Sequence, residues 1–309
     1  MKSGTLCKVL SVAMLLGGSG LVSCDRSPAR RTTIAVVPKV DDASVAAAKA
    51  AALAARDAYG IAVRWDVSRS ATAKSQAELV GKLVEAGVDG LLLSCIDASN
   101  AELNEAIDRA VAKGVAVGTF DSDAPQSGRS FYIGSDNTAA GRLAAETLRA
   151  LCAAAGRPAE GIGVVEAWAG DAAMEARLAA LVQEVPDTAA VLGGDGAAEA
   201  ALRMQVGTFL TEQAQRPVNG MVFLSSVSVI DGPGAIARLD SLCREAEGGV
   251  LFFDPSEALL EFVAEIPHGA AIRQDFEAMV SGGIERLLRV IRGEPFGETV
   301  TYTPVGVVR

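Results

Sequence analysis

The sequence predicts an α/β protein with two doubly wound parallel-sheet lobes, and two observations lead to this class. Hydrophobic residues make up 50% of the 309 residues but aromatic residues only 5%, which suits sheets covered by closely packed helices. From Thr32 onward, short β-branched or leucine-rich runs alternate with longer stretches of helical period. Repeated strand, helix, strand units imply parallel sheets with right-handed crossovers.

The strands of the first lobe are expected in four apolar runs, at residues 32–37, 61–67, 90–95 and 115–120. A helix is expected from Ser99 to Lys113, between the last two runs, because apolar residues recur there at helical spacing. Ser99 and Glu102 fit a capping box at its start, and Gly114 fits a stop at its end.

The same alternation restarts after Asp136 and predicts a second lobe. Its strands are expected at residues 161–167, 190–194, 220–226 and 249–254. Its helices are expected at residues 138–155, 172–184 and 198–214, with a further one after residue 233. A helix from Phe276 to about Arg292 and a short terminal strand, VTYTPVGVV, are too little for a third domain, so we expect them to complete the existing sheets.

The first 23 residues have the pattern of an export signal. Lys2 and Lys8 supply positive charge, an apolar run extends from Val9 to Leu16, and small residues follow. This run is too short to span a bilayer. We therefore expect residues 1–23 to be removed from the mature protein.

The sequence LVSC, which ends at Cys24, matches a bacterial lipobox, so Cys24 is predicted to carry a diacylglycerol. Residues 24–32 would then form a short polar tether. Several acyl chains hold a protein at a membrane almost permanently. We expect a periplasmic protein, or one on the outer face of the cytoplasmic membrane, whose lipid is its only membrane contact. The alternative is an ordinary secretory signal that ends near a cysteine.

The net charge argues against nucleic acid as a partner. Loss of the signal removes Lys2 and Lys8 and no acidic residue, so the formal charge falls from −10 to −12. A surface this acidic repels phosphate backbones.

The residue pattern does not predict a catalytic or a metal site. Cys95, Cys152 and Cys243 remain after Cys24 and lack close spacing, so neither a disulfide framework nor a zinc site is expected, and Cys95 is interpreted as a buried thiol. The single histidine, His268, is expected in a turn. The sequence contains no nucleophile elbow and no P-loop, so no enzymatic activity, cofactor or metal is predicted.

Polar residues follow the predicted strands at the edge where open parallel sheets bind ligands. Lys39 and Asp41 follow the first strand, Asp121 the fourth, and Asp254 the last strand of the second lobe. Any one of these acids could be a helix cap or a turn residue. Their recurrence after several strands predicts a ligand site.

From Thr33 to Val308 the chain resembles the ribose-type, type I periplasmic binding proteins that serve ABC sugar importers. The most specific segment is Ala86 to Glu146, and further matches are the helix of Arg177 and the sequences VLFFDPSEA, AAIRQDF and RVIRGEPF. In such proteins the chain crosses between the lobes three times, here near residues 135, 274 and 303. The resemblance therefore implies an N-terminal lobe of residues 33–135 plus 275–303 and a C-terminal lobe of residues 136–274 plus 304–309.

Members of this family hold a sugar between the lobes with charged side chains that bond pairs of hydroxyl groups. By local matching, the resemblance assigns this role to Asp121, Arg177, Asp254 and Gln274. Ser226 lies near a position where ribose binders have an asparagine. Arg177 could instead form a surface ion pair with Glu175 or Glu184.

The chain also departs from the ribose binders. They have an arginine where this chain has Ser122, and a phenylalanine pair where it has small residues at positions 44–46. Trp168 is expected either to replace the missing rings or to pack as a partly buried side chain. Lys39 is similar to a residue of members that bind rhamnose or the furanosyl signalling molecule autoinducer-2.

The resemblance implies a monomeric solute-binding lipoprotein of an ABC-type sugar importer, which binds a monosaccharide-like ligand in the cleft between two closing lobes. Its partners would be the permease and the ATPase of that importer. The alternative is a ligand sensor that presents a sugar or a non-sugar molecule to a membrane kinase or chemoreceptor. The sequence leaves both the ligand and this choice open.

Overall fold

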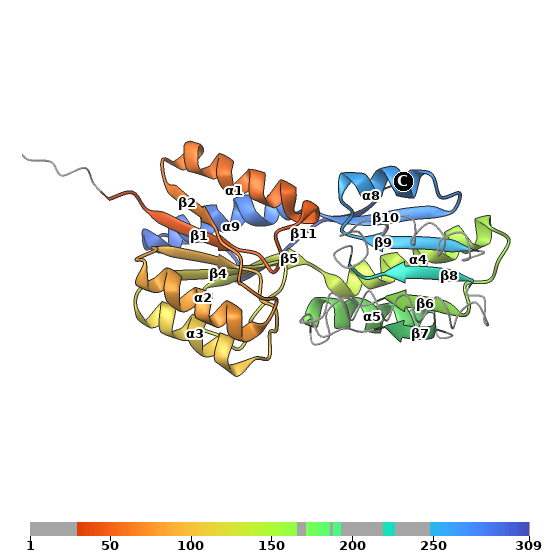
Figure 1. The fold of residues 1–309 in the computed structure, drawn as a ribbon, viewed down its shortest axis with the longest axis horizontal. Helices are drawn as coiled ribbons and strands as arrows, with labels where there is room; N and C mark the ends of the chain where they lie inside the picture. Colours follow the sequence, from red (N-terminus) through yellow and green to blue (C-terminus); the bar gives the residue numbers. More distant parts are fainter. Residues whose placement is uncertain (1–29, 166–170, 186–187, 193–218, 226–247, 309) are drawn as a thin grey trace, which may run out of the picture. The chain divides into compact units, whose positions relative to one another are not determined.

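The computed structural model describes residues 30–165, 171–185, 188–192, 219–225 and 248–308. Within them, the chain from Arg31 onward is one compact unit that contains two six-stranded sheets (Figure 1). We call each sheet with the helices that cover it a lobe. The α/β class with doubly wound parallel sheets is confirmed.

The first sheet is parallel at every pairing. Its strands, in spatial order, are β11 (Val300–Thr303), β5 (Phe131–Ser135), β4 (Ala116–Phe120), β3 (Gly90–Leu93), β1 (Thr33–Val37) and β2 (Ala62–Trp65). Side chains of β1 alternate between the two faces, because Ile34 and Val36 belong to one buried cluster and Ala35 and Val37 to another.

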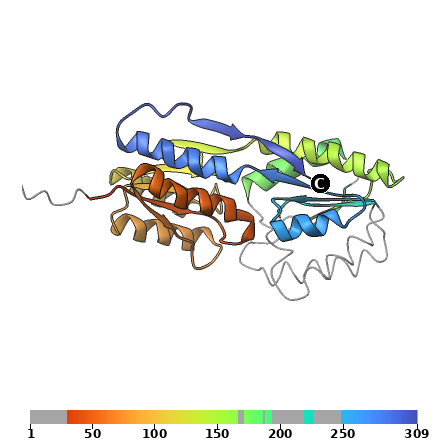
Figure 2. The same cartoon turned by 90° about the horizontal axis from the view of Figure 1, so that it is seen from above.

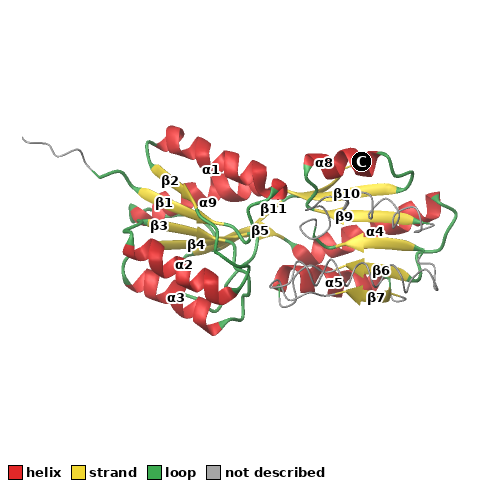
Figure 3. Ribbon diagram, viewed as in Figure 1, coloured by secondary structure: helices red, strands yellow, loops and turns green. Residues whose placement is uncertain are grey.

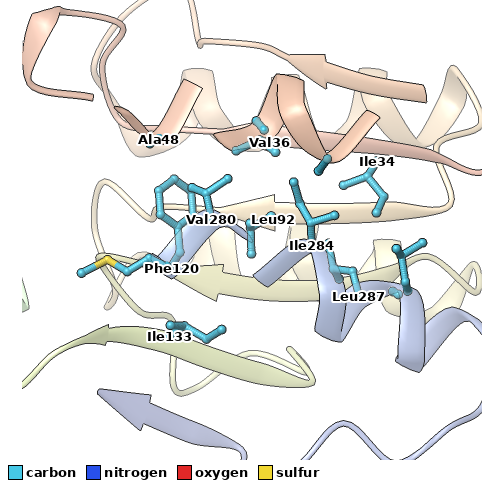
Figure 4. Close-up of a cluster of buried hydrophobic side chains, with 14 of the residues drawn as sticks. Ile34, Val36, Ala48, Leu92, Phe120, Ile133, Val280, Ile284 and Leu287 are labelled. Carbon is cyan, nitrogen blue, oxygen red and sulfur yellow. The ribbon is translucent and has the colours of Figure 1, made fainter. Parts of the chain in front are cut away.

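Helices cover both faces of this sheet. On one face lie α1 (Ala46–Tyr59), which follows a short 3-10 turn, η1 (Ala43–Val45), and α9 (Phe276–Ile291). Figure 2 shows α9, in blue, beside α1, in red-brown, and Figure 4 shows Val280 and Ile284 of α9 packed with strand residues. The other face is covered by α2 (Ala73–Glu85) and α3 (Ala101–Ala112).

The second sheet is parallel except for β12, which is antiparallel to β10. Its strands, in spatial order, are β12 (Val305–Val308), β10 (Gly269–Gln274), β9 (Gly249–Phe253), β8 (Gly220–Phe223), β6 (Ile162–Val165) and β7 (Thr188–Leu192). Figure 3 shows the helices of this lobe, of which α4 (Asn137–Ala154) and α5 (Ala172–Glu184) pack on one face and α8 (Glu257–Ala264) on the other.

In the described part of the chain, three short connections join the sheets. Ser135 ends β5 in the first sheet and α4 begins at Asn137 in the second lobe. Gln274 ends β10 in the second sheet, and α9 then packs on the first. Pro304 separates β11 of the first sheet from β12 of the second, and it has no N–H to donate to either ladder. At each connection, an element of one lobe is therefore followed within one or two residues by an element of the other.

The structure corrects two expectations about single elements and adds two strands. Asn100, not Ser99, caps α3, because its Oδ1 accepts from the N–H of Leu103 while the Ser99 hydroxyl donates to Asp97. The expected terminal strand is two strands in different sheets. The strands β5 and β10 were not predicted from the residue pattern. The helices expected at 198–214 and after residue 233 lie outside the described residues.

The expectations for Gly114, Cys95 and His268 agree with the structure. Gly114 follows α3 with a φ of 83°, as expected of a helix stop. Cys95 is buried and His268 lies in a turn before β10. Cys95 and Cys152 form no disulfide in the described ranges, and no group of His, Cys, Asp or Glu there is arranged to hold a metal ion. No helix among the described residues has the length and hydropathy to cross a bilayer.

Candidate functional site

Two carboxylates occupy matching positions in the two lobes. Asp121 follows β4 with a φ of 58° and Asp254 follows β9 with a φ of 53°, and no other described non-glycine residue has a positive φ. The N–H of Asp121 donates to the carbonyl of Ile133 (3.0 Å), and that of Asp254 donates to Ile272 (2.9 Å). Left-handed backbone at a non-glycine residue costs about 1–3 kcal/mol and concentrates at functional sites. The chain therefore holds one carboxylate of each lobe in a defined, strained position.

Arg177 of α5 lies next to the second of these carboxylates. Its side chain is 2% exposed, and its Nη1 lies 3.4 Å from Asp254 Oδ2. Nε donates to Oδ1 of Asn137 (2.8 Å), Nη1 donates to the carbonyl of Leu224 (3.0 Å), and the guanidinium lies 4.5 Å from the centre of the Phe253 ring. These contacts fix the guanidinium from four sides.

A surface ion pair of Arg177 with Glu175 or Glu184 is therefore wrong as an interpretation. Glu184 instead accepts a hydrogen bond from Arg149 (2.7 Å).

Gln274, at the end of β10, completes the group in the second lobe. Its Nε2 donates to Asp254 Oδ1 at 2.8 Å. Burial raises the pKa of Asp254 above its ordinary value, against the opposing effects of Arg177 and Gln274. Oε1 of Gln274 is buried and has no hydrogen-bond partner. One strong acceptor at the site thus has no partner among the described residues of the protein.

Lys39 joins the two lobes directly. Its Nζ donates to Oδ2 of Asp171, the N-cap residue of α5, and lies 3.5 Å from Oδ2 of Asp121. Burial alone would lower the pKa of Lys39, but the carboxylates of Asp121 and Asp171 outweigh it and raise that pKa. Burial likewise opposes the ionised form of Asp171, but Lys39 holds the pKa of this carboxyl below its ordinary value. Both groups are therefore charged at neutral pH.

Hydroxyl groups complete the polar surroundings of Asp121. The hydroxyl of Ser94 donates to its Oδ2 (2.7 Å), and the phenol of Tyr132 donates to its backbone carbonyl (2.8 Å). The hydroxyl of Ser122 donates to Asp171 across the lobes at 3.3 Å. Burial raises the pKa of Tyr132, so its phenol remains a hydrogen-bond donor at neutral pH.

Several of these side chains, but not Gln274, Ser122 or Tyr132, line a cavity of about 50 Å³. Lys39, Asp121, Asp171, Arg177 and Asp254 contribute to it from both lobes. A water molecule takes up about 30 Å³ in the liquid, so this space is smaller than a monosaccharide. A ligand that reaches these groups has to displace Lys39 from Asp171 or use neighbouring space.

A second cavity, of about 460 Å³, provides such space. It shares Ser44, Asp254 and Phe276 with the small cavity, and Gln274 also lines it. Pockets for small ligands measure about 300–1,000 Å³. The larger cavity falls within this range and the smaller one does not.

The structure brings together five of the eight side chains singled out in the sequence. Lys39, Asp121, Arg177 and Asp254 line the small cavity, and Gln274 bonds to Asp254. Trp168 and Ser226 lie outside the described residues, as does the predicted lipidation site, Cys24.

Asp41, which the sequence also singled out, lies apart from this group. It lines neither cavity, its side chain is 38% exposed, and it accepts hydrogen bonds from Lys49 (2.8 Å) and from the indole of Trp65 (3.0 Å). Its position after β1 directs it to the start of α1 and not to the second lobe.

The sequence interpretation missed Asp171 and Asn137. Asp171 is recognisable in the sequence as a helix cap, because it precedes the predicted helix 172–184. Its pairing with Lys39, 132 positions away, has no local signal.

The arrangement suits the recognition of a polyhydroxylated molecule. Carboxylates and a guanidinium can each bond two adjacent hydroxyl groups, and here they converge from two lobes. Burial raises the pKa of the Cys95 thiol, so this cysteine is protonated and a poor nucleophile at neutral pH.

Comparison with known proteins gives a family and a fold. The profile of a family described as periplasmic binding protein domain matches residues 34–295. The solute-binding protein of an ABC transporter from Burkholderia graminis C4D1M, in complex with D-arabinose, is similar in structure with a TM-score of 0.76. It shares 24% sequence identity, over 91% of this chain and 96% of that one.

Two further solved structures have the same fold. A carbohydrate transporter solute-binding protein from Agrobacterium Radiobacter, in complex with D-arabinose, has a TM-score of 0.78 and 23% identity, over 91% of this chain and 95% of its own. An ABC transporter periplasmic solute-binding protein from Actinobacillus succinogenes 130z, with bound D-allose, has a TM-score of 0.72 and 21% identity, over 90% of this chain and 97% of its own.

Proposed function

This chain belongs to the periplasmic binding protein domain family, and from this premise we propose that it is a sugar-binding receptor of an ABC importer. The observation that carries the proposal is the convergence of Asp121 from one lobe with Arg177 and Asp254 from the other on one cavity. Similar structures with bound D-arabinose or D-allose support a monosaccharide as the ligand.

In the proposed function, ligand binding stabilises a conformation in which the two lobes are closed. A ligand shifts a conformational equilibrium only by the difference in its affinity for the two states. A sugar whose hydroxyl groups bond Asp121 and Asp254 at the same time has this difference, because only closed lobes present both carboxylates to it. We infer that the closed, liganded form is the one that docks on the permease and its ATPase.

The charges of the site favour a ligand without negative charge. Lys39 is paired with Asp171 and Asp121, and Arg177 with Asp254. Each cationic group therefore already has a carboxylate partner, and burial of an additional anion there would lack compensation. A neutral polyol can instead exchange hydrogen bonds with these ion pairs.

Export and anchoring form part of the proposal. The signal pattern of residues 1–23 and the lipobox cysteine, Cys24, support an exported lipoprotein held at a membrane by its lipid alone. We infer a monomer that acts as a receptor and does not transform its ligand.

A thermal-shift screen with D-arabinose, D-allose and other pentoses and hexoses tests the proposal. At least one sugar should raise the melting temperature of the wild-type protein, because a ligand that binds only the folded state stabilises it. Asp121→Ala and Gln274→Ala should abolish this shift, whereas Asp41→Ala, which removes a carboxylate outside both cavities, should retain it. Absence of a shift with every sugar, or a wild-type shift in Asp121→Ala, would refute the proposal.

A further inference from the structure

The larger cavity lies where three helices begin. Its lining includes Ala46 and Ala47 at the start of α1, Glu257 at the start of α8, and Phe276 at the start of α9. Pro304, between β11 and β12, also lines it, so the cavity adjoins two of the three connections between the sheets. Its shape therefore depends on both lobes.

One polar atom at this cavity lacks a partner in the protein. Gln274 lines the cavity and is 4% exposed, and its Oε1 has no hydrogen bond although its Nε2 is held by Asp254. A buried acceptor without a partner costs about 1–3 kcal/mol. A ligand hydroxyl or amine that donates to Oε1 would remove this cost.

One aromatic residue and several small side chains line the same cavity. Phe276 lines both cavities and packs on the buried cluster of the first lobe, so its ring is anchored. The wall of η1 and α1 consists of Ala43, Ser44, Ala46 and Ala47, which leave room beside the ring. Apolar C–H faces of a sugar pack well on an aromatic side chain.

The charge at the cavity favours ligands that are neutral or positively charged. Asp254, Glu257, Asp275 and Glu277 line it, and among the described lining residues the single cationic group is Arg273. Arg273 is already paired with Glu257 at 3.0 Å. An anionic sugar would meet carboxylates without a free cation.

We propose that the larger cavity is a second compartment of the ligand site, which receives a neutral or amine-bearing sugar ring against Phe276, with Gln274 Oε1 as an acceptor. Asp254, shared by both cavities, then bonds a hydroxyl group of the same ligand. This inference rests on the proposed function and specifies where the ring lies and which charge it carries.

Cavity-filling substitution tests the compartment. Ala47→Phe places a ring in the larger cavity without changing the charged groups of the small one. Ala50→Phe, on the same helix but outside both cavities, is the matched control. Phe276→Leu keeps an apolar side chain on the buried cluster but removes the ring.

Calorimetric titration of each variant uses D-arabinose, D-allose, D-galactose, D-galactosamine and D-galacturonate. For any sugar that binds the wild-type protein, Ala47→Phe and Phe276→Leu should lower the affinity about tenfold or more, and Ala50→Phe should leave it unchanged. D-galacturonate should bind more weakly than D-galactose and D-galactosamine.

Wild-type affinity in both Ala47→Phe and Phe276→Leu, or a preference for D-galacturonate, would overturn the second compartment and leave sugar binding intact. If circular dichroism shows that Ala47→Phe is unfolded, the affinity of Phe276→Leu alone decides whether the second compartment is upheld. If the wild-type protein binds none of these five sugars and none of the other pentoses and hexoses of the thermal-shift screen, the proposed function fails and the compartment fails with it.

Discussion

Asp254 shows how the site depends on single buried groups. Its carboxylate is the partner of both Arg177 and Gln274, and its raised pKa reflects the cost of burying its charge. Loss of one partner of a buried ion pair leaves the other charge without compensation. The stability of this lobe is therefore sensitive to side chains that the proposed function also requires.

We predict that Asp254→Ala lowers the free energy of unfolding by about 3–5 kcal/mol, because Arg177 is left buried without its carboxylate. Asp41→Ala removes a half-exposed ion pair and should cost less than about 1 kcal/mol. Urea denaturation monitored by circular dichroism measures both. Equal losses in the two variants would contradict the ion pair as the cause.

The raised pKa of Lys39 predicts how the free energy of unfolding depends on pH at alkaline values. Its pKa in the folded protein is raised above the ordinary value of about 10.4, so its contribution to stability is complete below that pH and is lost as the pH rises through the folded value. Lys39→Met should remove this alkaline loss, which urea denaturation from pH 8 to about pH 11 would detect. An unchanged alkaline slope in the variant would show that another group is responsible.

Helices and most strands were predictable because their signals are local. The helix 172–184 agrees with α5, and the predicted start of α9 agrees with the observed one. The cap of α3 was displaced by one residue because Ser99 and Asn100 are both capping residues, and the choice depends on Asp97. Strand β5 was missed because Gly134 and Ser135 interrupt its short apolar run, FYIGS, although all five residues are buried.

Substitution at the start of α3 tests the corrected cap. Asn100→Ala should lower the free energy of unfolding by about 0.5–2 kcal/mol, because Leu103 loses the acceptor for its N–H. Ser99→Ala should cost less than about 0.5 kcal/mol, since Ser99 is exposed and its hydroxyl donates only to Asp97. A larger loss at Ser99 would restore the sequence-based capping box.

The contact between α4 and α5 positions Arg177. A Cβ at Gly141 of α4 would lie 2.3 Å from the backbone carbonyl of Arg177, so Gly141→Ala forces the helices apart. We predict that Gly141→Ala lowers the stability of the protein and weakens its binding of sugar.

Gly81→Ala is the control. Gly81 lies on the exposed side of α2, and a Cβ there would have nothing within 4 Å, so this substitution should raise stability by about 0.5–1 kcal/mol and leave binding unchanged. Thermal unfolding and calorimetric titration of the two variants measure both effects; unchanged binding in Gly141→Ala would show that α5 adjusts without moving its guanidinium.

At the scale of the whole molecule, the site exists because residues far apart in sequence meet at one edge of each sheet. The rule that ligands lie beyond the carboxyl ends of parallel strands pointed to Asp121 and Asp254, but equally to Asp41, which lies apart from them. The roles suggested for Arg177 and Gln274 came from the family resemblance and stay predictions. The pairing of Lys39 with Asp171 and the larger cavity depend on how the lobes pack, which no local pattern encodes.

The crystal structure of the protein with a bound sugar tests the central claim most directly. The account predicts one ligand whose hydroxyl groups lie within about 2.6–3.2 Å of Asp121 in the first lobe and of Arg177 or Asp254 in the second. A sugar bound to one lobe alone, or at a place remote from these three side chains, would contradict it.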